Sequence, residues 1–313
     1  MKAGLRIDVD THDGMTEGIP RLLDVLRSRG ARATFYCAMG YDNSGRAVFG
    51  ALFRRGFLSK MLRTRALAAY GLRTALSGTL LPARPIGHSR PDLLRRIIDE
   101  GHELGAHSWD HRRWQDRLDS MTAEEVRADL NRSVVALADA TGRPATTVAA
   151  PAWLSRPESL AHEESLGLRF ASDCRGRTPF YPSVGGRSLK LLQVPTTLPT
   201  LDELLGLECA TVGDFFDRIA RELDAAEGSA VARPAQDAFA VLTVHAELEG
   251  RAQAAEFDAF LAGTLGRHRW APLGELADEW REKAPHCGMV RAKIAGRHGE
   301  VSTQGSEVQG SQA

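Results

Sequence analysis

The chain has 313 residues, 43% of them hydrophobic, and its 40 lysines and arginines balance 40 aspartates and glutamates. This length fits one α/β domain of roughly 250 residues with room for an insertion. The zero net charge argues against nucleic acid as a partner, because no overall basic excess would attract a phosphate backbone. The four cysteines are irregularly spaced and form no Cys-x-x-Cys pair, which argues against a disulfide scaffold or a thiolate zinc site.

No targeting segment is recognisable at the start of the sequence. Residues 1–6 lead directly into a strand pattern, without a long apolar core followed by a cleavage site. We also find no run of about eighteen apolar residues, the length that spans a bilayer. We therefore expect a cytoplasmic protein.

Strand-like and helix-like stretches alternate along most of the chain. Apolar runs predict strands at residues 5–9, 33–38, 103–106, 146–150, 168–172, 189–194 and 238–245. Helical spacing of apolar residues predicts helices at residues 18–29, 91–100, 122–141, from about 157, 212–226 and 256–267. This alternation predicts a parallel sheet with right-handed crossovers. We expect one catalytic domain over residues 1–297, and a disordered tail over the polar residues 298–313.

Residues 43–91 interrupt the alternation and contain no aspartate or glutamate. Cations and bulky apolar residues are mixed there, among them Arg54, Arg55, Phe57, Lys60, Arg63 and Arg65. This mixture is typical of a helix that lies on an anionic membrane surface. A solvated helical insertion with a basic face is the alternative. We favour a membrane-facing insertion within the catalytic domain.

Two carboxylates end the first predicted strand. Asp8 and Asp10 are two residues apart, so on an extended strand both point to the same side. Two buried carboxylates on one side repel each other unless a cation or a proton lies between them. A pair of turn or capping aspartates is the alternative, because a turn-like sequence follows. We favour a metal site.

Three histidines follow later strands. His107 and His111 are four residues apart, so both imidazoles project to one side if the chain turns helical there. His245 ends the strand at 238–245. Two surface histidines and one core histidine are the alternatives. Because the carboxyl ends of parallel strands meet at one edge, we expect imidazoles and carboxylates to meet there, a ligand set that suits zinc, cobalt or manganese.

Three further residues are candidates on weaker grounds. Trp153 follows the strand at 146–150 and could line a sugar pocket, although core packing is the more common role. Asp173 and Arg175 follow the strand at 168–172. They could orient a catalytic histidine or carboxylate, or form an ordinary exposed ion pair.

With these motifs in this order, the chain resembles the polysaccharide deacetylase family. The matching segments are Asp8-Val9-Asp10, His107-Ser108-Trp109-Asp110-His111, Pro151-Ala152-Trp153, Asp173 and His245. The resemblance implies an incomplete (β/α)7 barrel. It also implies one divalent transition metal, Mn, Co or Zn, bound by Asp10, His107 and His111.

The same resemblance implies roles for the remaining residues. Asp8 would act as general base and His245 as general acid, with Asp173 holding His245 in its tautomer. Trp153 and Arg175 would contact the substrate. Two departures stand out. A valine separates the two aspartates, and Ala149 and Ala150 stand where an arginine usually precedes the third-motif proline, so Arg175 is a candidate to replace that arginine.

Within the family, four segments resemble enzymes that deformylate undecaprenyl phosphate-linked 4-deoxy-4-formamido-L-arabinose. They are residues 5–11, 172–176, 195–200 and 245–250. This implies a lipid-linked aminosugar substrate, an anionic membrane surface as partner, and a place on the cytoplasmic face of the bacterial inner membrane. It also implies a role in lipid A modification and polymyxin resistance. No obligate protein partner is evident. The alternatives are a deacetylase of another amino sugar and a non-catalytic, membrane-associated carbohydrate-binding protein.

Overall fold

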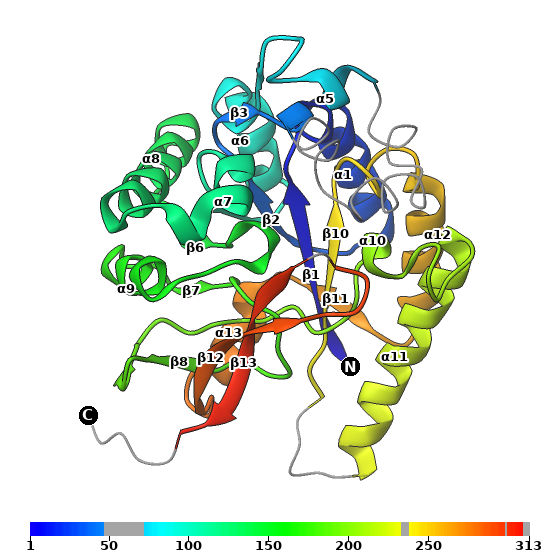
Figure 1. Ribbon diagram of the computed structural model, residues 1–313. Coiled ribbons are helices and arrows are strands. Elements are labelled where there is room, and N and C mark those ends of the chain that lie inside the picture. Colours follow the sequence, from blue (N-terminus) through cyan, green and yellow to red (C-terminus); the bar gives the residue numbers. More distant parts are fainter. Residues whose placement is uncertain (47–71, 233–237, 298, 309–313) are drawn as a thin grey trace.

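The computed structural model describes residues 1–46, 72–232, 238–297 and 299–308 (Figure 1). Its centre is a seven-stranded sheet in the order β10-β1-β2-β5-β6-β7, with β11 paired to the start of β1. The strands are β1 (Lys2–Val9), β2 (Thr34–Cys37), β5 (Glu103–Ala106), β6 (Thr147–Val148), β7 (Phe170–Ala171), β10 (Val241–His245) and β11 (Arg269–Ala271). All of its pairings are parallel. The carboxyl ends of the strands therefore lie at one edge.

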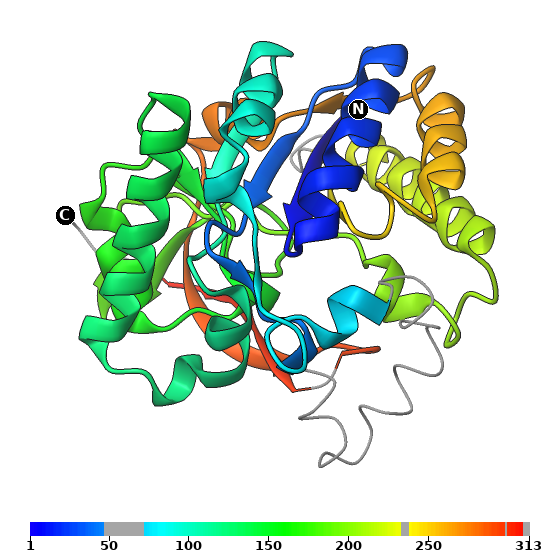
Figure 2. The ribbon, with the colours of Figure 1, turned by 90° about the horizontal axis from the view of Figure 1, so that it is seen from above.

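Helices cover the sheet, as seen from above in Figure 2. They are α1 (Ile19–Arg29), α6 (Pro91–Asp99), α8 (Ala123–Thr141), α9 (Pro157–Ser165), α11 (Val212–Ala232), α12 (Ala254–Thr264) and α13 (Leu273–Trp280). The fit of α1 is typical: it buries Ile19, Leu22, Leu23 and Leu26 at helical spacing. It ends at Gly30, whose φ of 62° is left-handed. Thr122 and Glu125 form the expected capping box of α8.

The observed elements confirm most of the predicted ones, with two corrections. Residues 189–194 do not form a strand of the central sheet, and β11 supplies the seventh strand instead. Within this segment Gln193 makes only isolated bridges, to Ala171 and Phe180. The second correction concerns the tail: Glu300–Glu307 form β13, not a disordered segment.

The β13 strand belongs to a second sheet of order β13-β12-β8-β9. Its other strands are β8 (Tyr181–Val184), β9 (Arg187–Ser188) and β12 (His286–Lys293). Antiparallel pairing with β12 satisfies the backbone of β13, and buried Ser302 accepts a bond from the amide of Ser155 at 3.0 Å. The side chains of β13 are mostly polar, so its strand character depends on these long-range bonds.

Short elements connect the sheet to the helices. They are η1 (Gly14–Gly18), β3 (Tyr41–Asp42), α5 (Leu72–Leu76), β4 (Arg84–Pro85), η2 (Gly87–Ser89), α7 (His111–Arg117), η3 (Leu118–Ser120), η4 (Pro151–Trp153) and α10 (Leu201–Leu204). The flanks of the predicted insertion meet through antiparallel pairing of β3 with β4. The membrane-facing residues predicted within it, Arg54, Arg55, Phe57, Lys60, Arg63 and Arg65, lie outside the described residues.

Candidate metal centre and active site

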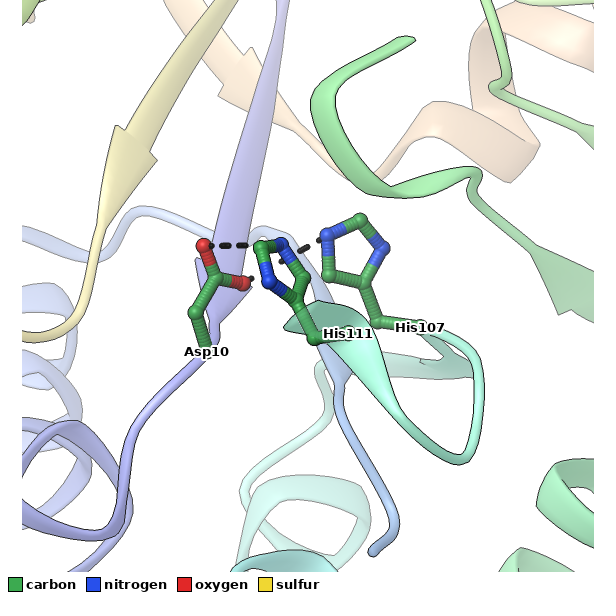
Figure 3. A group of neighbouring side chains, drawn as sticks. All are labelled: Asp10, His107 and His111. Atoms are coloured by element: carbon green, nitrogen blue, oxygen red, sulfur yellow. Dashed lines mark ion pairs between the residues drawn. The ribbon is translucent and has the colours of Figure 1, made fainter. Parts of the chain in front are cut away.

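Asp10, His107 and His111 converge at the carboxyl edge of the sheet (Figure 3). Asp10 follows β1, His107 follows β5, and His111 begins α7. The His107 Nε2 atom lies 3.4 Å from Asp10 Oδ1, and His111 Nε2 lies 3.2 Å from Asp10 Oδ2. One ligand atom from each residue lies within 4.8 Å of the others. The three residues thus converge as the metal-site hypothesis requires.

The donor set fits a divalent transition metal. His107 Nδ1 donates to the carbonyl of Ala149 at 2.7 Å, which leaves the lone pair on Nε2. Burial lowers the pKa of His107 to about 4, which favours the neutral ring that a metal needs. The Oδ1 atom of Asp10 is buried without a hydrogen-bond partner among the described residues. A cation would satisfy that oxygen.

The loop between the two histidines is fixed from α8. Asp129 accepts hydrogen bonds from the amides of Trp109 and Asp110, at 2.8 and 3.1 Å. Asp110 in turn caps α7 by accepting from the amide of Arg113 at 2.9 Å. Ser108 has a φ of 66°, a conformation costly for a non-glycine residue, which these bonds hold in place. Asp129 is therefore a positioning residue that we did not predict.

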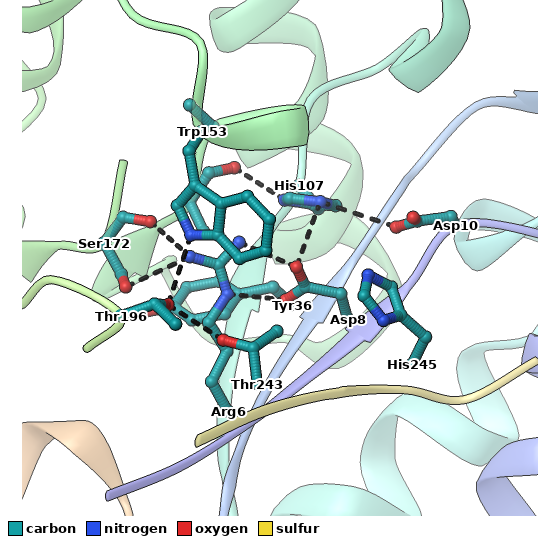
Figure 4. Close-up of polar contacts among 12 residues, drawn as sticks. Arg6, Asp8, Asp10, Tyr36, His107, Trp153, Ser172, Thr196, Thr243 and His245 are labelled. Atoms are coloured by element: carbon teal, nitrogen blue, oxygen red, sulfur yellow. Dashed lines mark hydrogen bonds and ion pairs between the residues drawn. The ribbon is translucent and has the colours of Figure 1, made fainter. Parts of the chain in front are cut away.

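Asp8 forms a buried, bidentate ion pair with Arg6. Arg6 Nε donates to Asp8 Oδ1 and Nη2 donates to Oδ2, both at 2.7 Å (Figure 4). Burial disfavours the charged carboxylate, but Arg6 and His107 outweigh it and lower the pKa of Asp8. Arg6 is thus the arginine that pairs with Asp8, whereas Arg175 donates to Glu203 and to the carbonyl of Leu198. Because side chains alternate along a strand, Arg6 and Asp8 face the same side.

His245 ends β10 and lies in the same site. It is paired in register with Asp8 between β10 and β1, and its ring lies beside the carboxylates of Asp8 and Asp10 (Figure 4). Burial opposes its charged form, but Asp10 and Asp8 raise the pKa of His245 above its ordinary value. Its amide donates to Glu249 at 2.8 Å, and Glu249 is fully buried. Glu249 therefore fixes the end of β10.

Asp173 does not contact His245, contrary to its predicted role. Its two oxygens accept from the amide of Ala150 at 2.8 Å and from Gln193 Nε2 at 2.7 Å. Burial raises the pKa of Asp173 and of Glu163, which share a hydrogen bond. Since Ala149 binds His107, Asp173 holds the segment next to that carbonyl. It supports the metal side of the site.

Trp153 and Arg175 are both buried, with 1% and 7% exposure. The Trp153 indole donates to Thr196 Oγ1 at 3.1 Å and lies between the guanidinium groups of Arg6, Arg175 and Arg297. Arg175 donates to Glu203 and to the carbonyl of Leu198. Both side chains have partners within the protein, and their contact with a substrate stays a prediction.

Comparisons with known proteins agree with this geometry. The model of the family described as polysaccharide deacetylase matches residues 11–171. The chain is 35% identical, over 98% of its length and 96% of the other, to a Shewanella sediminis protein named "Probable 4-deoxy-4-formamido-L-arabinose-phosphoundecaprenol deformylase ArnD". A Wigglesworthia glossinidia brevipalpis protein of the same name is 29% identical over 93% of this chain and 98% of its own. A crystal structure described as a polysaccharide deacetylase of Mycobacterium smegmatis has a TM-score of 0.62 at 18% identity, covering 94% of each chain.

A parallel half-barrel covered by helices, with acids and imidazoles gathered at the carboxyl ends of its strands, is the arrangement of a barrel-type α/β enzyme. The chain belongs to the polysaccharide deacetylase family. It is accordingly a hydrolase that acts on amide bonds. The predicted fold, an incomplete barrel of the deacetylase type, is confirmed.

Proposed function

We propose that the chain is a metal-dependent deformylase of undecaprenyl phosphate-linked 4-deoxy-4-formamido-L-arabinose. The observation that carries the proposal is the meeting of Asp10, His107 and His111 beside the Asp8–His245 pair. The names of two relatives, which align over 98% and 93% of this chain, support the choice of substrate. The products are formate and a free sugar amine, which follow from adding one water across the formamide C–N bond.

Asp10, His107 and His111 would hold one divalent transition metal. When bound, the metal supplies Lewis acidity that polarises a carbonyl and lowers the pKa of water. Manganese, cobalt and zinc all suit one carboxylate and two imidazoles. The Ala149 carbonyl and Asp129 hold the two histidines in the orientation that this binding requires.

Asp8 is the general base in this proposal. Its carboxylate accepts a proton from the attacking water, and the lowered pKa of Asp8 keeps it ionised at neutral pH. Arg6 holds both oxygens in one plane and so fixes the direction from which the proton arrives. As the base gains its proton, Arg6 loses part of its attraction to it. The low pKa of Asp8 thus keeps the carboxylate ionised before the reaction, but it also weakens the driving force for proton transfer from water to Asp8.

His245 is the general acid. Its raised pKa keeps the imidazolium populated at a pH where an ordinary histidine is largely neutral. The proton passes from the ring to the sugar nitrogen as the C–N bond breaks, so the amine leaves uncharged. Asp8 and His245 approach the reacting carbon from neighbouring strands, which allows one residue to accept a proton and the other to donate one.

Membrane attachment is the second element of the proposal. No helix within the described residues is long and apolar enough to cross a bilayer. The described flanks of the insertion expose Tyr41, Leu80 and Leu81, at 43%, 70% and 38%, and the side chains of Arg46 and Arg73 are also exposed. Exposed apolar and cationic side chains together favour an anionic lipid surface. We place the enzyme peripherally on the cytoplasmic face of the inner membrane, in lipid A modification and polymyxin resistance.

Mass spectrometry of a short-chain lipid-linked formamido-arabinose, incubated with the protein and manganese or cobalt, tests the reaction. We expect loss of the formyl mass and release of formate. The matched acetamido sugar tests the choice of acyl group, and faster loss of acetyl would favour a deacetylase. An unchanged substrate with metal-loaded protein would contradict the proposal.

Vesicle sedimentation tests the membrane element. We expect vesicles of anionic phospholipid to bind the protein at low salt and to release it at high salt. Leu80→Asp should weaken binding several-fold. The matched control is Leu207→Asp, since Leu207 is 58% exposed and lies in a different part of the chain. Equal effects of the two substitutions would argue against a docking surface at Leu80.

A further inference from the structure

A groove with a volume of about 580 Å³ lies between α7, η4 and the β12–β13 hairpin. Its walls carry four arginines and three acids: Arg112, Arg156, Arg291, Arg297, Asp116, Asp119 and Glu300. Arg112 directly follows the candidate metal ligand His111, and Ala152 in the groove directly precedes Trp153. Two elements that line the groove thus continue directly into residues of the site region.

Most of these charges are already compensated within the walls. Arg112 forms a bidentate pair with Asp116, and Arg291 donates to Asp119 at 3.1 Å. Arg156 donates to the carbonyls of Leu118 and Met121 and to Glu158. These bonds occupy many of their donors. Glu300 is exposed.

Arg297 differs from the other three arginines. Among the described residues one hydrogen bond of its guanidinium is found, from Nη1 to Glu203 at 3.2 Å. The guanidinium lies over the Trp153 ring, 4.5 Å from its centre, and the side chain is 12% exposed. Glu203 is shared with Arg175, so two guanidinium groups face one buried carboxylate. Arg297 thus presents donors to the groove with its charge only partly compensated.

The backbone holds Arg297 in this place. Gly296 has a φ of 78°, and a Cβ atom there would lie 2.0 Å from the carbonyl oxygen of Glu203. Only glycine allows the turn to approach α10 this closely. A planar guanidinium that is stacked on an indole and tethered at one nitrogen is preorganised to bind an oxyanion with its remaining donors.

We infer that this groove binds the phosphate of the lipid-linked substrate, with Arg297 as its principal donor. The inference rests on the proposed function, which supplies a phosphate linked to the sugar. Residues 289–302 of the groove lie beyond the segment 11–171 that the family model matches. Arg297 is a specificity residue and takes no part in the chemical step.

Kinetics with two matched substrates test the inference. One is a short prenyl phosphodiester of the formamido sugar, and the other is the prenyl glycoside without phosphate. Arg297→Gln should raise KM for the phosphodiester about 10- to 100-fold with kcat nearly unchanged, because phosphate contacts persist from bound substrate to transition state. Turnover of the glycoside should change less than about twofold. Arg297→Lys keeps the positive charge but loses the planar guanidinium. Its KM for the phosphodiester should lie between those of the unmodified enzyme and Arg297→Gln.

Arg187→Gln is the matched control, because Arg187 lies on β9 of the same sheet, is 63% exposed and pairs with Glu164. It should leave both substrates unaffected. Equal losses on both substrates in Arg297→Gln would overturn the inference and indicate a structural role through Glu203 and Trp153. An unchanged KM for the phosphodiester would overturn it as well.

Calorimetric binding of farnesyl phosphate, which carries no sugar, separates this inference from the proposed function. We expect the unmodified protein to bind it and Arg297→Gln to lose at least about tenfold in affinity. The enzyme could fail to deformylate both the phosphodiester and the glycoside while Arg297→Gln still binds farnesyl phosphate more weakly than the unmodified protein. In that case the proposed function fails and the phosphate site stands. If the sugars are deformylated while farnesyl phosphate binds both proteins equally, the phosphate site fails alone.

Discussion

The carboxyl edge of the central sheet and the wall formed by the β12–β13 hairpin are joined through Trp153, which lies against Arg6 and Arg297, but they are built differently. At the edge, the ionisable side chains lie at or just beyond the ends of buried strands, and Asp8 is held by a buried partner two residues away, Arg6. In the wall, Ser302 and Arg297 reach residues 147 and 94 positions away, at Ser155 and Glu203. In our proposals the edge performs the chemistry and the wall recognises the phosphate. Substitutions in the two regions should therefore fail in different ways.

The largest loss should follow removal of a metal ligand. His111→Ala leaves two ligands, so we expect metal content well below one ion per chain and turnover lower by at least about 10³-fold. Elemental analysis and formate release measure the two effects. Chelation of the unmodified protein should cause the same loss, with a lower Tm that added manganese or cobalt restores. Full activity of His111→Ala at low metal content would separate the cluster from catalysis.

Loss of the general base should be nearly as large, but with the metal retained. Asp8→Asn removes the proton acceptor, and we expect kcat to fall about 10²- to 10⁴-fold at normal metal content. It also leaves the Arg6 charge buried without its counterion, so the free energy of unfolding should drop by roughly 3–5 kcal/mol. Chemical denaturation measures that drop.

His245→Gln distinguishes chemistry from stability at the same edge. The substitution removes the proposed acid, so kcat should fall about 10²-fold or more. It leaves no buried guanidinium without its counterion, so the free energy of unfolding should change less than in Asp8→Asn. Normal turnover of His245→Gln at normal metal content would rule out the acid role.

Several site residues at the carboxyl edge could be predicted from the sequence, because each belongs to a local sequence pattern. A buried strand that ends in Asp8 and Asp10, and histidines four residues apart, indicate chemistry wherever parallel strands end together. Arg6 offered the same signal, a cation in an apolar strand two residues before an acid, and so could have been recognised as the partner of Asp8. Asp129 could not, because an acid on an amphipathic helix normally faces solvent.

The wall could not be predicted in this way. The β13 strand has mostly polar side chains and lacks the apolar alternation that marks a strand. Its order comes from pairing with β12 and from bonds to Ser155 and Arg175. The contact of Arg297 with Trp153 joins distant residues through a turn at Gly296. Such contacts depend on the completed fold.

A smaller effect is expected from a substitution that keeps the catalytic groups and changes only the pKa of one of them. Arg6→Lys keeps a positive charge but loses the two-pronged bond to Asp8, so the pKa of Asp8 should rise from its lowered value. Since the base must be ionised, the acid limb of the kcat/KM profile should move to higher pH. Activity should fall on that limb and change little at higher pH. The alkaline limb, governed by the raised pKa of His245, should stay in place.

The outcome for Arg6→Lys is specific to a role through Asp8. A merely structural role would lower activity evenly at all pH values, through a smaller fraction of folded protein. Metal content should be unchanged in either case, because Arg6 is not among the three candidate ligands. A profile that keeps its acid limb would contradict the proposed tuning.

The smallest effect on catalysis should come from the wall. Ser302 accepts from the Ser155 amide at 3.0 Å and shares a hydroxyl–hydroxyl contact with the same residue at 2.8 Å. Ser302→Ala leaves that buried amide unpaired, so unfolding free energy should fall by about 1–3 kcal/mol. Turnover of the phosphate-free glycoside should change less than twofold. Thr303→Ala is the matched control on the neighbouring residue, which is less buried and makes one long bond of 3.4 Å. A tenfold loss of kcat in Ser302→Ala at unchanged Tm would show that the wall takes part in the chemistry.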